Sequence, residues 1–169
     1  MGLCFLLCHL LFGKNMKDLI EWKTELSVGI QEIDEQHQIL IKLINNLYHS
    51  IIKRTENEVI YDILNELVQY TVVHFAVEES LMRIFNYPGY DEHKKHHEDL
   101  KQQVIDLQTK VWDNESSVSM ELFKFLKDWL TKHILMDDKK YVPFFLERGL
   151  QQTWAKKSWA GKIWDYMRT

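Results

Sequence analysis

The 169-residue sequence contains little proline and glycine, and these residues are unevenly placed. Two prolines and six glycines are present, and neither type occurs in 30–87 or in 90–142. Sandwiches and barrels need turn residues every ~8–12 positions, so an all-β fold is excluded. The two uninterrupted tracts, separated by Pro88 and Gly89, indicate helices arranged in pairs.

Cysteine, excess positive charge and long apolar runs are also scarce. The only cysteines are Cys4 and Cys8, so the rest of the chain can form neither a disulfide framework nor a thiolate metal site. This usage fits a reducing compartment, and we expect a cytoplasmic protein. The net charge of −4 gives no electrostatic footprint for nucleic acid. No apolar run approaches the ~18 residues that cross a bilayer, so no transmembrane segment is expected.

Apolar residues at helical spacing are abundant. Beyond Gly29, four segments each carry one stripe in which apolar residues recur at every third or fourth position. The stripes predict helices over 31–53, 57–85, 91–112 and 118–136. Short connections place successive helices antiparallel. We therefore expect an all-α fold, an up-down-up-down four-helix bundle that spans 17–149.

The two ends of the chain lie outside this pattern. Residues 1–16 form an N-terminal extension, for which three interpretations stay open: a peripheral membrane anchor, a segment packed on the bundle, or a stretch upstream of a start at Met16. Residues 150–169 form a tail with three tryptophans, four basic residues and one acidic residue. This tail is predicted to be a short helix packed on the bundle or a docking segment for a protein or a membrane surface. The oligomeric state is left open.

Six ionisable side chains occupy stripe positions that should be apolar. They are His37, His74, Glu78, His93, His97 and His133. A buried carboxylate without a partner costs several kcal/mol, and a buried imidazole without one costs roughly 1–3 kcal/mol. One isolated core histidine is ordinarily satisfied by a hydrogen bond, but six such groups in one small core need a common partner. Because every predicted helix contributes at least one, the pattern indicates a metal site in the bundle core.

Spacing within the helices supports a shared metal site. His93 and His97 are four residues apart, as are His74 and Glu78. Each pair therefore projects from one side of its helix. These two pairs lie on different predicted helices, so the metal site would join them across the core.

A second carboxylate is expected near His133, and helix geometry leaves two candidates open. On an unbroken helix Asp137 would share the face of His133, whereas Asp138 would point about 140° away. The fourth helix can also end or be distorted here, with Pro143 close behind. The remaining histidines lie off the stripes and are interpreted as solvent-facing or structural: His9, His49 and His96.

Five imidazoles and two carboxylates, with no thiolate, are too many donors for one ion. This donor set fits iron or manganese, whereas structural zinc more often takes four ligands, frequently cysteine. Two octahedral ions offer twelve positions. Five imidazoles, two bridging carboxylates and one shared oxo or hydroxo group would fill eleven. The last position, in an apolar core, suits a small neutral ligand such as dioxygen.

These residues resemble the hemerythrin family, specifically its bacterial members, the bacteriohemerythrins. The resemblance covers roughly residues 20–148, and its specificity lies in the order and spacing of all its pieces together. The matching pieces are Trp22, Ser27-Val28-Gly29-Ile30, Ile33-Asp34-Glu-Gln-His37, His74-Phe-Ala-Val-Glu78-Glu79, Tyr87-Pro-Gly-Tyr90, His93-Lys-Lys-His-His97 and His133-Ile-Leu-Met-Asp-Asp138-Lys-Lys-Tyr141.

The resemblance implies a non-haem di-iron centre, oxo- or hydroxo-bridged, that binds dioxygen reversibly. The implied ligands are three histidines on a coordinatively full iron, two on the iron with an open position, and two bridging carboxylates: His93, His97 and His133; His37 and His74; Glu78 and Asp138. Because the family places the bridging aspartate five residues after the histidine, the resemblance selects Asp138 over Asp137.

The resemblance also implies oxygen storage or delivery, with no catalytic residues. Two alternatives are a module that senses oxygen or redox state and signals through a partner, and a di-iron enzyme acting on peroxide or nitric oxide. Carboxylate-rich di-iron enzymes use paired Glu-x-x-His motifs. That motif does not occur in this sequence, so an enzyme is not expected. Apolar walls that exclude water are expected from Leu40, Leu81 and Trp129.

Overall fold

The computed structural model describes residues 16–112 and 120–150. Within these ranges the chain forms helices, turns and loops but no strand, which confirms the all-α prediction. The elements are the 3₁₀ turn η1 (Thr24–Leu26), α2 (Gln31–Ile52), α3 (Asn57–Ile84), α4 (Tyr90–Trp112), α5 (Met120–Lys132), the π-helical turn η2 (His133–Asp138) and α6 (Lys139–Glu147). The N-terminal extension up to residue 15 and the tail from residue 151 lie outside the described residues.

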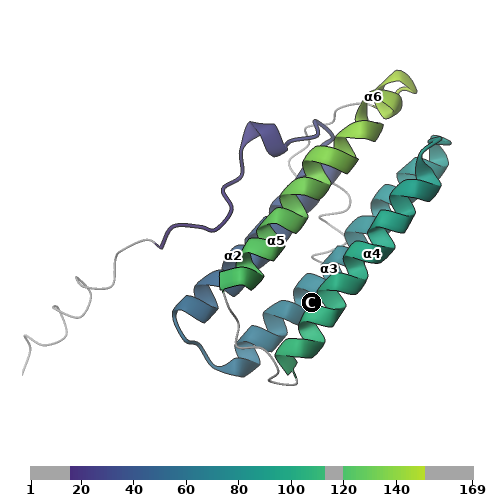
Figure 1. Ribbon diagram of the computed structural model, residues 1–169. Helices are drawn as coiled ribbons and strands as arrows, with labels where there is room; N and C mark the ends of the chain where they lie inside the picture. Colours follow the sequence, from purple (N-terminus) through teal and green to yellow (C-terminus); the bar gives the residue numbers. More distant parts are fainter. Residues whose placement is uncertain (1–15, 113–119, 151–169) are drawn as a thin grey trace, which may run out of the picture.

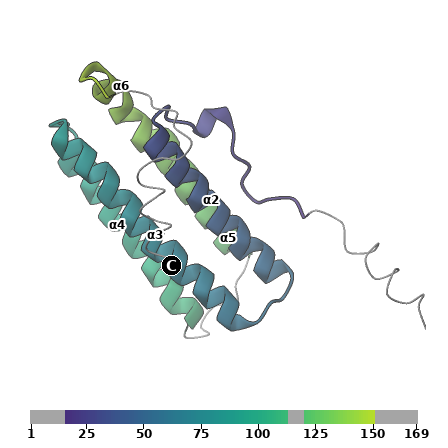
Figure 2. The same ribbon diagram turned by 180° about the vertical axis from the view of Figure 1, so that it is seen from behind.

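The helices run alternately up and down as two side-by-side pairs, α2 with α5 and α3 with α4 (Figure 1). The view from behind shows the same pairing and the short connection between α2 and α3 (Figure 2). In addition, α2 packs along α3. The first three helices begin and end within one residue of their predicted bounds. The four-helix bundle inferred from the stripes is therefore confirmed.

The apolar stripes face the common axis of the bundle, as their spacing predicts. Fully buried side chains from α2, α3 and α5 make up most of its centre: Ile33, Leu40, Ile44, Leu47, Leu64, Leu67 and Leu126. No helix among the described residues is long and apolar enough to span a membrane. The buried side chains therefore lie along one stripe of each helix, and polar side chains cover much of the remaining helix surface.

The fourth helix differs from its prediction. Instead of ending near residue 136, it passes through the π turn η2 and continues as α6 to Glu147, with Pro143 inside it. Proline fixes φ near the helical value, but it removes one backbone hydrogen bond and its ring crowds the carbonyl four residues earlier. The predicted stripe position Met136 is wrong, since its side chain is 63 % exposed. The π turn inserts an extra residue into the helical repeat and rotates Met136 outward.

The entry into α2 is held by one buried carboxylate. Asp34 accepts hydrogen bonds from Ser27 Oγ at 2.6 Å, from the backbone N–H of Val28 at 2.7 Å and from that of Gly29 at 3.2 Å. Gly29 has a φ of 75°, in the left-handed region that glycine adopts at little cost. Ile30 at the N-cap supplies no side-chain hydrogen bond, and Asp34 instead ties the first turn of α2 to the backbone N–H groups of the two residues before the N-cap. This contact anchors the first turn of α2, in which Asp34 lies three residues before His37.

Replacing Asp34 with alanine should lower the free energy of unfolding by about 3 kcal/mol, because three donors lose a charged acceptor. Urea unfolding of the metal-free protein, followed by circular dichroism, measures the change. The matched control is Asp62→Ala, which removes an exposed carboxylate from α3 and should change stability by less than about 0.5 kcal/mol. Equal effects of the two substitutions would contradict the role of Asp34 in holding the segment before α2.

Candidate metal centre

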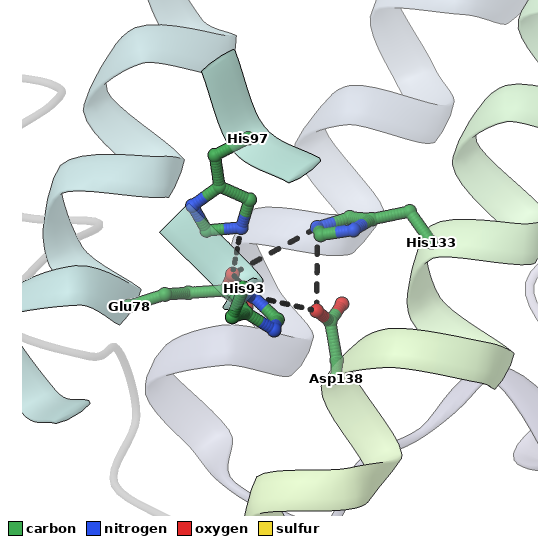
Figure 3. A group of neighbouring side chains, drawn as sticks. All are labelled: Glu78, His93, His97, His133 and Asp138. Carbon is green, nitrogen blue, oxygen red and sulfur yellow. Dashed lines mark ion pairs between the residues drawn. The ribbon is translucent and has the colours of Figure 1, made fainter. Parts of the chain in front are cut away.

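The structure brings all seven predicted ligand residues together in one half of the bundle. They lie in the first turns of α2 and α4, toward the end of α3 and just beyond the end of α5. Figure 3 shows five of them, which are Glu78, His93, His97, His133 and Asp138. Every helix of the bundle contributes: His37 from α2, His74 and Glu78 from α3, His93 and His97 from α4, and His133 and Asp138 from the π turn η2. All seven are buried, and the most exposed of them, His93, is 6 % exposed.

The seven side chains divide into two sets that could each hold a metal ion. In each set, the donor atoms lie within 4.8 Å of one another. The larger set has three histidines and the smaller has two, and both contain the same two carboxylates: Glu78, His93, His97, His133 and Asp138; His37, His74, Glu78 and Asp138. We call these the three-histidine half and the two-histidine half.

The carboxylate of Glu78 turns one oxygen toward each half. Its Oε2 atom lies 3.1 Å from His97 Nε2 and 3.5 Å from His93 Nε2. Its Oε1 atom lies 3.7 Å from His74 Nε2. A carboxylate divided in this way can bridge two metal ions.

The two carboxylate oxygens of Asp138 also face different halves. Its Oδ1 atom lies 3.3 Å from His133 Nε2 and 3.7 Å from His93 Nε2, in the three-histidine half. Its Oδ2 atom lies 3.1 Å from His37 Nε2, in the two-histidine half. Both carboxylates therefore lie between the two halves, and neither belongs to one alone.

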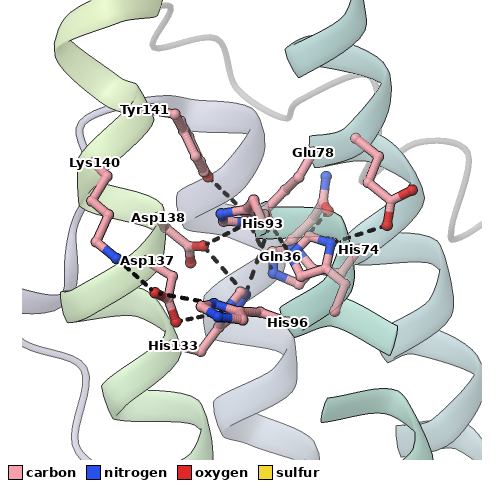
Figure 4. A network of polar contacts seen from close by, with 12 residues as sticks. Gln36, His74, Glu78, His93, His96, His133, Asp137, Asp138, Lys140 and Tyr141 are labelled. Carbon is pink, nitrogen blue, oxygen red and sulfur yellow. Dashed lines mark hydrogen bonds and ion pairs between the residues drawn. The ribbon is translucent and has the colours of Figure 1, made fainter. Parts of the chain in front are cut away.

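The π turn explains how Asp138, and not Asp137, comes to face the centre. Hydrogen bonds in a π turn span one residue more than in an α-helix, so the fifth residue after His133 returns to the same side. Asp138 is fully buried, whereas the side chain of Asp137 is 18 % exposed. Asp137 accepts a hydrogen bond from Lys140 Nζ at 3.1 Å and lies 3.6 Å from the Nδ1 atom of His96 (Figure 4).

Burial decides the protonation of the cluster. Loss of solvation lowers the pKa of His37 to about 4 and that of His74 to about 3, and it holds the pKa of His133 well below 6.5. Burial also raises the pKa of Asp138 well above its usual range, with the Glu78 charge acting in the same direction. Burial opposes ionisation of Glu78 too, but the surrounding histidines, His74 first, hold its pKa well below the usual value. Near neutral pH these imidazoles are therefore uncharged.

The unsatisfied atoms of the cluster fit a bound cation. The Nε2 atoms of all five histidines, Oε2 of Glu78 and both oxygens of Asp138 are buried without a hydrogen-bond partner. In two histidines the Nδ1–H donates outward, from His74 to Gln36 Oε1 and from His97 to Glu79 Oε1, each at 3.1 Å. Nε2 then carries a lone pair that faces a carboxylate oxygen, and two acceptors this close need a positive ion between them. Imidazole and carboxylate donors without thiolate suit iron or manganese.

Four outer partners of the cluster were not predicted in this role from the sequence, and one of them, Asp137, had been a candidate for the bridging carboxylate. Gln36, Glu79 and Asp137 each adjoin a predicted ligand in the sequence, and that adjacency was the available signal. The fourth, Tyr141, is fully buried, and its hydroxyl donates to Glu78 Oε1 at 2.5 Å (Figure 4). Such partners fix the tautomer and orientation of ligand side chains.

The histidines predicted to lie outside the centre are indeed elsewhere where they are described. His49 is partly buried and lies 3.3 Å from Asp18 Oδ1, away from the cluster. His96 is 42 % exposed and contacts Asp137. His9 lies outside the described residues.

The part of the chain that matches a known protein family includes the whole cluster. Residues 28–145 match the hemerythrin HHE cation binding domain. The chain belongs to the hemerythrin family. It is 39 % identical over 121 residues to a bacteriohemerythrin of Pseudomonas aeruginosa, covering 72 % of this chain and 78 % of that relative. It is 31 % identical over 126 residues to a bacteriohemerythrin of Methylococcus capsulatus, covering 74 % and 95 %.

Solved hemerythrin structures share the fold of this hemerythrin-family chain. A wild-type hemerythrin crystal structure superposes with a TM-score of 0.70 at 30 % identity and covers 75 % of this chain and 98 % of that one.

The hemerythrin-like protein of Naegleria gruberi is a further sequence relative, 34 % identical over 120 residues, covering 71 % of this chain and 88 % of that protein. The resemblance inferred from the sequence motifs is thereby confirmed.

The two adjacent aspartates offer a matched test of the centre. Asp138→Asn removes a charge from between the two halves, so we expect the affinity for the second metal ion to fall by more than about 100-fold. Asp137→Asn removes the same charge from the outer side, and we expect a loss of about tenfold at most. Cobalt(II) titration followed by visible absorption measures both. Similar affinities in the two variants would contradict the assignment of Asp138.

The lowered histidine pKa values predict how acid affects the metal-free protein. Unfolded histidines take up protons below their ordinary pKa of about 6.5, whereas folded His37 and His74 do so only near 4 and 3. Between these values the unfolded state binds more protons, so the free energy of unfolding should fall as pH is lowered from about 6.5 to 4. Urea unfolding after chelation, repeated at several pH values, measures this slope. A flat profile over that range would contradict the buried neutral histidines.

Proposed function

We propose that this protein binds dioxygen reversibly at a non-haem di-iron centre and serves in oxygen storage or delivery. The proposed ligands are those of the two halves: His93, His97 and His133; His37 and His74; with Glu78 and Asp138 bridging. The observation that carries the proposal is the unequal division of donors around two shared carboxylates. Relatives named bacteriohemerythrin and hemerythrin support the choice of iron.

The unequal halves suit the binding of one small ligand. The three-histidine half offers five side chains and the two-histidine half offers four. With one further oxygen shared between them, the first half would be complete for an octahedral ion and the second would keep one position open. When bound, a ferrous pair supplies that open position and two electrons for dioxygen.

The chain's own residues would keep this chemistry reversible by excluding water and protons. Leu40 is fully buried and Trp129 is 4 % exposed, so both can form the apolar walls expected near the centre. Leu81 is partly buried and packs against the same core. Burial also keeps the pKa of Tyr141 well above its usual range, so its hydroxyl stays protonated and holds Glu78.

The donor set also favours binding over catalysis. Five imidazoles and two carboxylates donate less negative charge to iron than a carboxylate-rich site does, so high-valent iron is less stabilised. We therefore still predict that the protein binds dioxygen and does not act as an enzyme. Sensing through a partner would depend on residues 151–169, which lie outside the described residues, and no described contact favours it.

An anaerobic titration tests the proposed function. We expect the reduced, iron-loaded protein to contain two irons per chain and to develop a visible charge-transfer band when dioxygen is admitted. Because binding is proposed to be reversible, the band should disappear when dioxygen is removed. One zinc per chain, or a band that does not reverse, would refute the proposal.

Two histidine variants make this titration specific to the centre. His74→Ala removes a donor from the two-histidine half and should abolish the reversible band. His49→Ala removes a partly buried histidine that pairs with Asp18 outside the centre, and the band should persist with unchanged amplitude. If both variants bound dioxygen alike, the assignment of the open position to the two-histidine half would be wrong.

A further inference from the structure

The side chains that surround the two halves differ in charge. In the three-histidine half, the imidazole of His97 donates its Nδ1–H to the carboxylate of Glu79 at 3.1 Å. The Nδ1 atom of His133 lies 4.0 Å from a carboxylate oxygen of Asp137. An anionic acceptor behind an imidazole raises its basicity and strengthens its donation to a metal. This half therefore has one imidazole, that of His97, hydrogen-bonded to a carboxylate, while the Nδ1 atom of His133 has no hydrogen-bond partner.

The two-histidine half lacks such anionic support among the described contacts. His74 donates to the neutral amide oxygen of Gln36, and the Nδ1 atom of His37 has no hydrogen-bond partner. Asp34 lies on the same helix as His37, but it directs its oxygens to Ser27, Val28 and Gly29. Neither imidazole of this half hydrogen-bonds an anion, whereas that of His97 in the other half does.

Tyr141 adds to this difference at the shared carboxylate. Its hydroxyl donates at 2.5 Å to Oε1 of Glu78, the oxygen that faces His74. The other oxygen, Oε2, faces His97 and His93 and has no hydrogen-bond partner. A charge-assisted hydrogen bond withdraws electron density from the oxygen that accepts it. Glu78 is therefore a weaker donor toward the two-histidine half than toward the three-histidine half.

We propose that Tyr141 and Glu79 are positioning residues that make the two metal positions electronically unequal, with the two-histidine position the poorer in electrons. This inference rests on the proposed function only in requiring two metal ions in the centre, and it does not require dioxygen to bind. Tyr141 acts through Glu78, and Glu79 acts through His97. A weaker donor set favours the ferrous over the ferric ion, so the position proposed to receive the ligand would resist spontaneous oxidation.

The test compares two variants of opposite expected sign, measured anaerobically on the iron-loaded full chain. Tyr141→Phe frees Glu78 Oε1 to donate more strongly, so the midpoint potential should fall and the ferrous-to-ferric ratio at a fixed applied potential should drop about tenfold. Glu79→Gln removes the anion behind His97, so the potential should rise and the same ratio should increase about tenfold. A merely structural role would move both potentials in the same direction or neither.

Mössbauer spectra of the ⁵⁷Fe-loaded protein separate the two positions. The quadrupole doublet changed most by Tyr141→Phe should not be the doublet changed most by Glu79→Gln. If both substitutions altered the same doublet, or if their potentials shifted in the same direction, the proposal would be overturned. Should the chain take up no iron, the proposed function fails, and cobalt(II) absorption bands of the same variants test the inequality instead.

Two control variants carry the same substitutions, tyrosine to phenylalanine and glutamate to glutamine, at positions that do not contact the ligands. Tyr87→Phe removes a hydroxyl that lies against the Gly89 turn, although the Tyr87 ring packs 6.4 Å from that of Tyr141. Glu98→Gln removes an exposed carboxylate of α4 that pairs with Lys94. Both should leave the potential and both doublets unchanged. A shift in either control as large as in its partner variant would overturn the assignment to Tyr141 or Glu79.

Discussion

The structure depends on the contact between uncharged imidazoles and carboxylates inside a dry bundle core. Without an ion, the Nε2 lone pair of the uncharged His74 would face a carboxylate oxygen of Glu78 at 3.7 Å. A cation between them turns this repulsion into attraction. Because the donors of the two halves together come from α2, α3, α4 and the turn η2 that follows α5, two ions would between them join all four helices.

Most of the fold could be predicted because it depends on local patterning. The stripes of α2, α3 and α4 have one apolar or ligand residue at every helical repeat, so their buried faces followed from spacing. Their bounds followed from the stripes together with turn residues such as Pro88 and Gly89. The same spacing identified His74 with Glu78 and His93 with His97, since i,i+4 pairs meet on one face. The error at Met136 arose because a change from α to π hydrogen bonding leaves no compositional mark.

Ideal α-helix geometry was not sufficient to choose between Asp137 and Asp138. An ideal α-helix favours Asp137, whereas the resemblance favoured Asp138, and the π turn reconciles the sequence with the buried position of Asp138. The hydrogen bond from Tyr141 to Glu78 could not be foreseen either, because these residues are 63 positions apart and meet only through packing. Partners adjacent to a ligand, such as Glu79, were visible in the motif, but their direction toward His97 was not.

The order of the donors along the chain has a consequence for biosynthesis. His37, His74 and Glu78 are translated early, but both halves also need Asp138, which lies beyond the start of α5. Neither position can reach its full set of donors until the ribosome has synthesised nearly the whole bundle and η2 has left the exit tunnel. Metal uptake would therefore be a late event in the maturation of each chain, and a truncated product that ends before η2 would lack a complete position.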